Sequence, residues 1–210
     1  MLSMRQKAGF TLIELVITLA VLGILLAFGL PSFSTWTQNS QIRTAAGAIQ
    51  NGLQLARSEA VRRNAPIRFQ LTSSIDDSCT IASNGGNWVI SFDDPTSACG
   101  HAVINEASPV SDTTANPAPR IIQRRPAAEA GGRAIVDASA AVVIFNGFGR
   151  LAPISPATAP VAMSIDIDAP SGDGDCDTAG TARCLRVTVS IGGQVRMCDP
   201  TLPSGDPQKC

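Results

Sequence analysis

The sequence has one histidine and no tyrosine among its 210 residues, and aromatic residues make up only 4% of it. Histidine is the most frequent general acid or base in enzymes, so the chain lacks the usual equipment for acid–base catalysis. The formal net charge is −1, which argues against a broad basic surface for nucleic acid but leaves room for a local basic patch. We therefore expect that the protein is not an enzyme and that it needs no cofactor.

Metal-binding patterns are also missing from the sequence. The cysteines include no CxxC pair, and the one histidine, His101, cannot complete a zinc site. Asp173, Asp175 and Asp177 alternate, but the glycine and glutamate that an EF-hand loop needs do not follow at the right positions. We expect no metal, a solvated loop around these aspartates, and His101 in a surface loop.

The six cysteines all lie beyond an N-terminal hydrophobic segment, at Cys79, Cys99, Cys176, Cys184, Cys198 and Cys210. This arrangement indicates an oxidised, extracytoplasmic domain. Sequence alone leaves many pairings open. Short loops favour Cys176–Cys184 and Cys198–Cys210, which leaves Cys79–Cys99 as the third disulfide.

Residues 10–30, FTLIELVITLAVLGILLAFGL, form an almost unbroken apolar run. At about 1.5 Å per residue, a helix of this length is just long enough to cross the core of a bilayer. Arg5 and Lys7 precede the run without any acidic residue, so the positive-inside rule keeps the N-terminus in the cytoplasm. We expect a single-pass membrane protein whose C-terminal domain lies across the membrane from the cytoplasm.

Two details argue against a plain membrane anchor. Glu14 lies inside the apolar run, where a carboxylate costs about 2.5–3.5 kcal/mol on insertion and should therefore have a cationic partner. The second detail is the block GFTLIE at residues 9–14, which resembles the class III leader junction of type IV prepilins. The resemblance implies that a prepilin peptidase cuts between Gly9 and Phe10 and methylates the new amine of Phe10. It also implies that Glu14 pairs with the N-terminal amine of a neighbouring subunit.

Gly23 and Pro31 match the same family, and the resemblance implies that the helix can break or unwind there inside a filament. Glycine weakens a helix by about 1 kcal/mol, and proline removes a backbone donor. The alternative is a simple kink between a membrane helix and a periplasmic helix.

The rest of the chain predicts an α+β fold, in which a long N-terminal helix packs on antiparallel sheet. Residues 31–63 continue the helix with an apolar stripe formed by Ile42, Ala45, Ala46, Ile49, Leu53, Ala56 and Ala60. Strands are expected at residues 67–71, 88–92, 141–145, 161–167, 185–191 and 194–197, with a hairpin turn at Gly192–Gly193. Residues 105–132 read as a long surface loop with one short strand near Ile121.

This order resembles the soluble domain of the GspH/FimT family of minor pilins and pseudopilins. Three segments carry the resemblance, namely LARSEA at residues 55–60, FNGFGR at residues 145–150 and GQVRMC at residues 193–198. The implied regions are a leader at residues 1–9, a transmembrane helix at 10–30, an amphipathic periplasmic helix at 31–63 and a disulfide-bonded, β-rich domain at 64–210.

Some FimT-type relatives bind DNA for natural transformation through a C-terminal Gly-Arg-x-Arg motif. The matching positions here begin with Gly193 and Gln194 and end with Arg196, so one arginine is replaced by a residue that cannot neutralise phosphate. The candidate DNA contacts are Arg183, Arg186, Arg196 and Lys209. An ordinary solvated hairpin is the alternative to DNA binding.

The resemblance implies a structural subunit that helps prime or cap assembly of a type IV pilus or of a type II secretion pseudopilus. The alternative function is that of a DNA-binding minor pilin. The implied partners are other pilins or pseudopilins of the same filament, the prepilin peptidase, the inner-membrane assembly platform and membrane lipid, with DNA as a further possibility.

Overall fold

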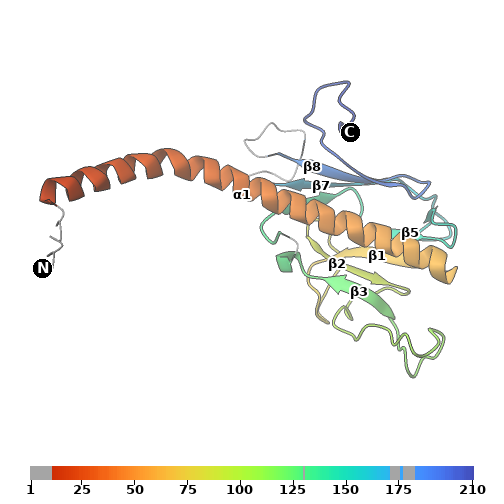
Figure 1. The fold of residues 1–210 in the computed structure, drawn as a ribbon. Coiled ribbons are helices and arrows are strands. Elements are labelled where there is room, and N and C mark those ends of the chain that lie inside the picture. Colours follow the sequence, from red (N-terminus) through yellow and green to blue (C-terminus); the bar gives the residue numbers. More distant parts are fainter. Residues whose placement is uncertain (1–10, 130, 171–175, 177–182) are drawn as a thin grey trace, which may run out of the picture. The chain divides into compact units, whose positions relative to one another are not determined.

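The computed structural model describes residues 11–129, 131–170, 176 and 183–210, without the side chains of residues 26–32. The chain divides into two compact units, Met1–Thr37 and Gln38–Cys210. The described elements are α1 (Leu12–Arg63), β1 (Ile67–Thr72), β2 (Asn87–Ser91), β3 (Ile121–Arg125), the 3-10 helix η1 (Ala127–Glu129), β4 (Ile135–Ala138), β5 (Val142–Phe145), β6 (Leu151–Ala152), β7 (Met163–Asp168), β8 (Leu185–Val189) and β9 (Val195–Cys198) (Figure 1).

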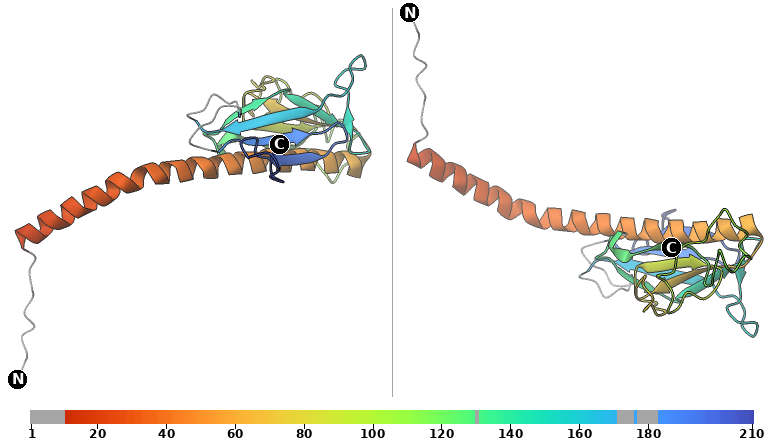
Figure 2. Two further views of the ribbon diagram at one scale, coloured as in Figure 1. Left: turned by 90° about the horizontal axis from the view of Figure 1, so that it is seen from above. Right: turned by 90° about the horizontal axis from the view of Figure 1, so that it is seen from below.

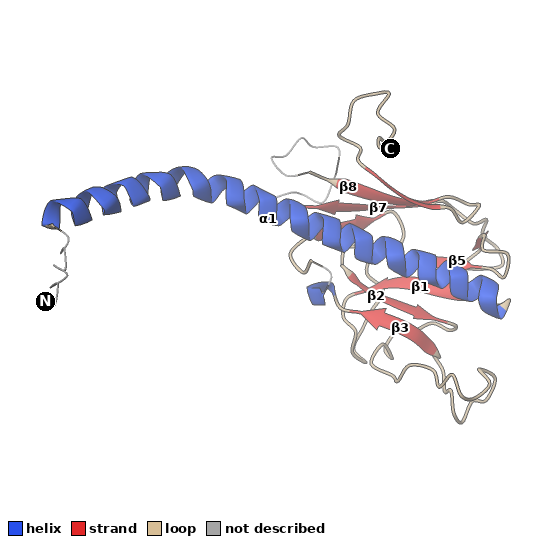
Figure 3. Ribbon diagram, viewed as in Figure 1, coloured by secondary structure: helices blue, strands red, loops and turns tan. Residues whose placement is uncertain are grey.

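The strands form two antiparallel sheets (Figure 3). The first has the order β3-β2-β1-β5-β6, and the second has the order β4-β7-β8-β9. In the unit Gln38–Cys210, both sheets lie on one side of the C-terminal half of α1 (Figure 2). This architecture confirms the predicted α+β fold, a long helix packed on antiparallel sheet.

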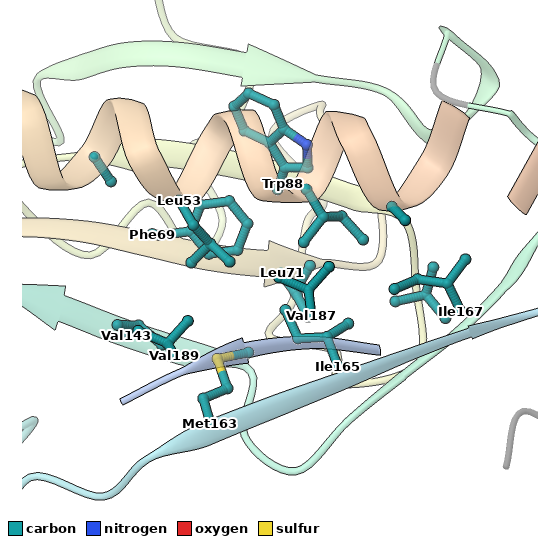
Figure 4. Close-up of a cluster of buried hydrophobic side chains, with 14 of the residues drawn as sticks. Leu53, Phe69, Leu71, Trp88, Val143, Met163, Ile165, Ile167, Val187 and Val189 are labelled. Carbon is teal, nitrogen blue, oxygen red and sulfur yellow. The ribbon is translucent and has the colours of Figure 1, made fainter. Parts of the chain in front are cut away.

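The helix buries the predicted apolar stripe against both sheets. All seven stripe residues are buried in one hydrophobic cluster with inward-facing side chains of β1, β2, β5, β7 and β8. Figure 4 shows Leu53 of α1 in this cluster with Phe69 and Trp88, whose ring centroids lie 5.7 Å apart. Gly52 allows this close approach, because a Cβ there would lie 3.0 Å from both of these rings. Burial of a continuous apolar face explains why this part of the chain is helical.

The helix ends at Arg63 because the next residues close it. Asn64 adopts a left-handed conformation, with φ 49°, and its N–H bonds the carbonyl of Val61 at 3.3 Å. The N–H of Ala65 reaches back to the carbonyl of Ala60 at 3.2 Å. These two bonds form a Schellman motif, which satisfies carbonyls that would otherwise be left unpaired at the end of the helix.

The strands follow the predicted alternation, with shifted ends. The strand expected at residues 161–167 begins at Met163, and the strand expected at 185–191 ends at Val189. Ser190 starts a tight turn there. Its N–H donates to the Gln194 carbonyl, and its carbonyl accepts from the Gly193 N–H. Residues 190 and 191, which the hydropathy pattern alone assigns to the strand, therefore belong to the turn.

Two short strands were not predicted, β4 and β6. β4 buries only Val136 fully and pairs with β7 at the edge of its sheet, while β6 has two residues. Residues 105–120 carry no strand, and β3 begins at the predicted Ile121. Ile121 packs with Val89 and the Cys79–Cys99 disulfide in a second buried cluster, on the side of β2 opposite the main core.

Candidate functional site

The start of α1 holds Glu14 in a reciprocal pair with Thr11. The Glu14 carboxylate accepts hydrogen bonds from the Thr11 N–H at 3.0 Å and from the Thr11 hydroxyl at 2.9 Å. In return, the Glu14 N–H donates to the Thr11 hydroxyl oxygen at 3.3 Å. This is a capping box, in which the cap residue and the third helical residue satisfy each other's backbone donors. The pattern Thr-x-x-Glu before an apolar run signals this arrangement in the sequence, and the sequence-based interpretation missed it.

The helix after this cap presents apolar side chains on all sides. Within the unit Met1–Thr37, exposed fractions range from 50% at Val16 to 81% at Leu12 among the large hydrophobic residues of segment 12–25. Glu14 is the one charged residue of this segment. An exposed apolar surface of this extent is typical of a segment that contacts a membrane or another protein.

In the part of the chain whose side chains are described, no helix contains a stretch both long and apolar enough to count as a membrane span. The predicted span, residues 10–30, extends beyond this part at both of its ends. The predicted cleavage pair, Gly9 and Phe10, lies outside the described residues. Helix α1 is continuous through Gly23 and Pro31, and a Cβ at Gly23 would have open space around it. Whether the helix unwinds at these two positions inside a filament stays a prediction.

The three segments that carry the resemblance, residues 55–60, 145–150 and 193–198, meet at the end of the domain where α1 ends. Arg57, from the first segment, donates from Nε to the carbonyl oxygen of Gly149, in the second segment, at 3.0 Å. Gly193, from the third segment, packs on the same carbonyl so closely that a Cβ there would overlap it. Segments far apart in the sequence thus form one structure around Gly149.

The turn at residues 146–150 is held by one side chain. The amide oxygen of Asn146 accepts from the N–H groups of Phe148 at 3.0 Å and of Arg150 at 3.1 Å. Backbone bonds from Asn146 to Arg150 and from Gly149 to Asn146 close the same turn. Gly149 has φ 70°, a conformation that favours glycine. Phe148 projects from this turn and is 85% exposed.

An ion-pair network lies at the same end of α1. The Glu59 carboxylate forms ion pairs with Arg62 Nη2 and with Arg63 Nε, each at an N···O distance of 2.7 Å. Glu106 pairs with the same two arginines. Burial raises the pKa of Glu59, but hydrogen bonds and charge from Arg62 and Arg63 outweigh burial, so that its pKa lies below the ordinary value. The network fixes the last turn of α1 beside the loop that carries Glu106.

The structure does not gather the candidate DNA contacts into one free basic surface. Arg186 makes a two-pronged ion pair with Asp166 on β7, at 2.5 and 2.6 Å. The Arg196 guanidinium donates to the backbone carbonyls of Pro207 at 2.9 Å and Lys209 at 3.0 Å, which ties β9 to the C-terminal loop. Arg183 is exposed at the entrance to β8, where its backbone N–H bonds the Asn39 side chain. Two of the four cations therefore already hold structure together.

Three disulfides are present: Cys79–Cys99, Cys176–Cys184 and Cys198–Cys210. Two are the pairs that the short loops favour, Cys176–Cys184 and Cys198–Cys210, and Cys79–Cys99 is the pair that these two leave. His101 is exposed in a loop, as expected. Asp173, Asp175 and Asp177 lie outside the described residues, and no cluster of potential metal ligands occurs among the residues that are described.

The family model described as type II transport protein GspH matches residues 45–193, and the prokaryotic N-terminal methylation motif matches residues 4–30. The chain is 28% identical over 81 residues to the type IV major alpha-pilin of Moraxella bovis, covering 39% of this chain and 51% of that protein. It is 36% identical over 58 residues to a fimbrial protein of Pseudomonas aeruginosa, covering 28% of this chain and 37% of that protein. The chain spans about half or less of the length of these curated relatives.

Among solved structures, the type IV minor pilin FimU of Pseudomonas aeruginosa aligns with a TM-score of 0.48 and 18% identity, covering 83% of this chain and 98% of that one.

Proposed function

Because the chain belongs to the GspH family and carries an N-terminal methylation motif, we propose that it is a minor subunit that helps prime or cap a type IV pilus or a type II secretion pseudopilus. The broader class, a pilin-like filament subunit, follows from its family and its relatives. The finer role, in the start or the end of assembly, is the proposal.

One observation carries the proposal: a single carboxylate, Glu14, near the start of the helical segment 12–25, whose large apolar side chains are all at least half exposed. In apolar surroundings an unpaired carboxylate is costly, and a cation brought by another subunit would offset that cost. The cation we propose is the methylated amine of Phe10 in a neighbouring subunit, after a prepilin peptidase has cut between Gly9 and Phe10. Helix segments that share such a contact would be held in register along the filament.

The domain that follows suits a periplasmic position. Its disulfides require an oxidising compartment, and residues 10–30 are proposed to anchor it in the inner membrane. The proposed partners there are the other subunits of the filament, the assembly platform and the surrounding lipid.

The experiment is a comparison of filaments from cells with and without the gene. We expect its deletion to lower the number of filaments per cell strongly, while the filaments that remain keep their normal length and major subunit. Immunodetection should find the wild-type chain in sheared filaments at a small fraction of the major subunit. Unchanged filament numbers, with the chain present only in the membrane, would contradict the proposal.

DNA binding stays a prediction from the sequence, and no specific observation favours it. Arg186 and Arg196 are engaged with Asp166 and with backbone carbonyls, and Gln194 takes the place of the other motif arginine. Phosphate binding would require these cations to exchange partners.

A further inference from the structure

We propose that Phe148 is an anchor that inserts into an apolar pocket on an acidic face of a different subunit of the same filament. The Phe148 surface consists of Phe148, Val61 and Ile191 with Arg57 and Arg150, at the end of the domain where α1 ends. The inference rests on the proposed function, because it names the surface through which this subunit meets a neighbour.

Phe148 is the most exposed large hydrophobic side chain in the described part of the unit Gln38–Cys210, at 85%. Val61 and Ile191 are also about half exposed, and both lie against the same turn. Val61 would contact a Cβ at Gly149, and the Ile191 carbonyl accepts from Leu151. A grouped set of exposed apolar side chains is typical of a protein–protein contact, whereas single exposed ones are common on any surface.

The turn that carries Phe148 is held by hydrogen bonds and by close backbone packing. The Asn146 amide oxygen accepts from the N–H groups of Phe148 and Arg150, Arg57 donates to the Gly149 carbonyl, and Gly193 packs on that carbonyl. A side chain presented in one fixed backbone conformation loses less freedom on binding than one on a mobile loop. The structure therefore holds an exposed aromatic ring ready for a partner, as in the anchors that dominate interface energies.

The charges around Phe148 indicate the chemistry of that partner. Arg57 and Arg150 have no carboxylate partner among the residues that the structure describes. In contrast, Arg62 and Arg63 on the same helix are paired with Glu59 and Glu106. A partner with aspartate or glutamate around an apolar pocket would neutralise the two arginines. A second copy facing this surface would instead bring like charges together, so a different subunit is the better fit.

The test places a photo-crosslinking amino acid at position 148 of the full-length chain, in cells that assemble filaments. The matched control is position 103, where Val103 is 56% exposed on another part of the domain. We expect a crosslink from position 148 to another pilin-like subunit, at a peptide that contains aspartate or glutamate, and none from position 103. Crosslinks only to a second copy, to DNA or to lipid, or no crosslink at all, would overturn the inference.

Variants supply a second measurement. Phe148→Ala should leave the melting temperature unchanged, because the ring is exposed, and should lower co-purification with the crosslinked subunit by about tenfold or more. Arg150→Glu should also lower it, while Arg150→Lys should keep most of it and Arg43→Glu, on an exposed part of α1, should have no effect. Wild-type co-purification of Phe148→Ala would overturn the inference.

The wild-type chain is first measured in sheared filaments, so that the two proposals fail separately. Its presence there without any crosslink from position 148 would overturn only the Phe148 surface. Its absence from filaments would contradict the proposed function, and with it this inference.

Discussion

The carboxylate of Glu14 accepts hydrogen bonds from both the backbone N–H and the hydroxyl of Thr11, at 3.0 and 2.9 Å. The single chain thus partly satisfies this carboxylate before any other subunit is present. A cation from a neighbouring subunit would have to share or replace the bonds from Thr11. The capping box therefore supplies hydrogen-bond partners to the Glu14 carboxylate before the proposed assembly contact forms.

The first prediction separates the charge of Glu14 from its hydrogen bonds. Glu14→Gln keeps the shape and most hydrogen bonds but removes the charge, so the chain should insert normally and be strongly depleted in sheared filaments. Glu14→Val should behave in the same way. Thr11→Val, which removes the hydroxyl but keeps the charge, should lower helix stability by about 1 kcal/mol and incorporation much less. Subunit levels in filaments and in the inner membrane decide the matter. Normal incorporation of both Glu14 variants would show that this residue makes no assembly contact.

The second prediction concerns processing. Mass spectrometry of the membrane-extracted protein should find a mature chain that begins with N-methylated Phe10. Gly9→Val should leave the chain inserted with its leader retained, because the residue before the cut is changed and the apolar run is not. The control is Gly23→Ala, which changes a glycine in open space and should be processed normally. A retained leader on the wild-type chain, in cells with an active prepilin peptidase, would refute the prediction.

The third prediction compares two adjacent glycines. Gly193 has φ 80° and contacts the Gly149 carbonyl, so Gly193→Ala should lower the free energy of unfolding by at least about 2 kcal/mol. A Cβ at Gly192 would lie 3.7 Å from the Ser190 hydroxyl, an ordinary contact, so Gly192→Ala should change stability by less than about 0.5 kcal/mol. Urea unfolding of the purified variants measures both values. Equal effects of the two substitutions would show that the packing on Gly149 adds no stability.

Much of the fold could be predicted because the stripe and the strands are repeated patterns. Between Ile42 and Ala60, apolar residues recur at intervals of three or four positions, as a helix requires, and all residues of this stripe are buried. Ile67, Phe69 and Leu71 alternate, and all three face the main core. β4 and β6 were not predicted, because a short edge strand has too few residues to show an alternating pattern. Only Val136 of β4 is fully buried.

The candidate site was less predictable, since its parts meet only through the tertiary fold. Each segment was recognisable by itself, but the contact of Arg57 and Gly193 with Gly149 depends on how α1, β5 and the β8–β9 hairpin pack. The pairing of Arg186 with Asp166 likewise depends on the register of β7 against β8, which the alternation of residues does not determine. For this reason the sequence made Arg186 look available when it is paired.

The fourth prediction concerns the disulfides. All six cysteines should resist alkylation before reduction. Replacing Cys79 and Cys99 together by alanine should destabilise the domain more than replacing Cys198 and Cys210 together by serine. The first pair is fully buried and fills the cluster with Ile121, whereas Cys210 is exposed at the end of the chain. Closing the C-terminal loop should contribute about 3 kcal/mol by chain entropy. A smaller loss from the buried pair than from the C-terminal pair would contradict the expected order.

The last prediction follows from Glu59, whose pKa is lowered because Arg62 and Arg63 outweigh the effect of burial. A folded pKa below the unfolded value of 4.5 means that the ionised group stabilises the fold above about pH 4.5. That stability is lost as the pH falls through the folded pKa, because the carboxylate must then take up a proton. Glu59→Gln should therefore lower the free energy of unfolding at pH 7, by about 1 kcal/mol. The difference from wild type should shrink steadily below pH 4.5. Urea titrations between pH 7 and pH 3 measure it, with Glu129→Gln on the exposed helix η1 as the control. A difference that stays constant over this range would mean that Glu59 acts through packing and not through its charge.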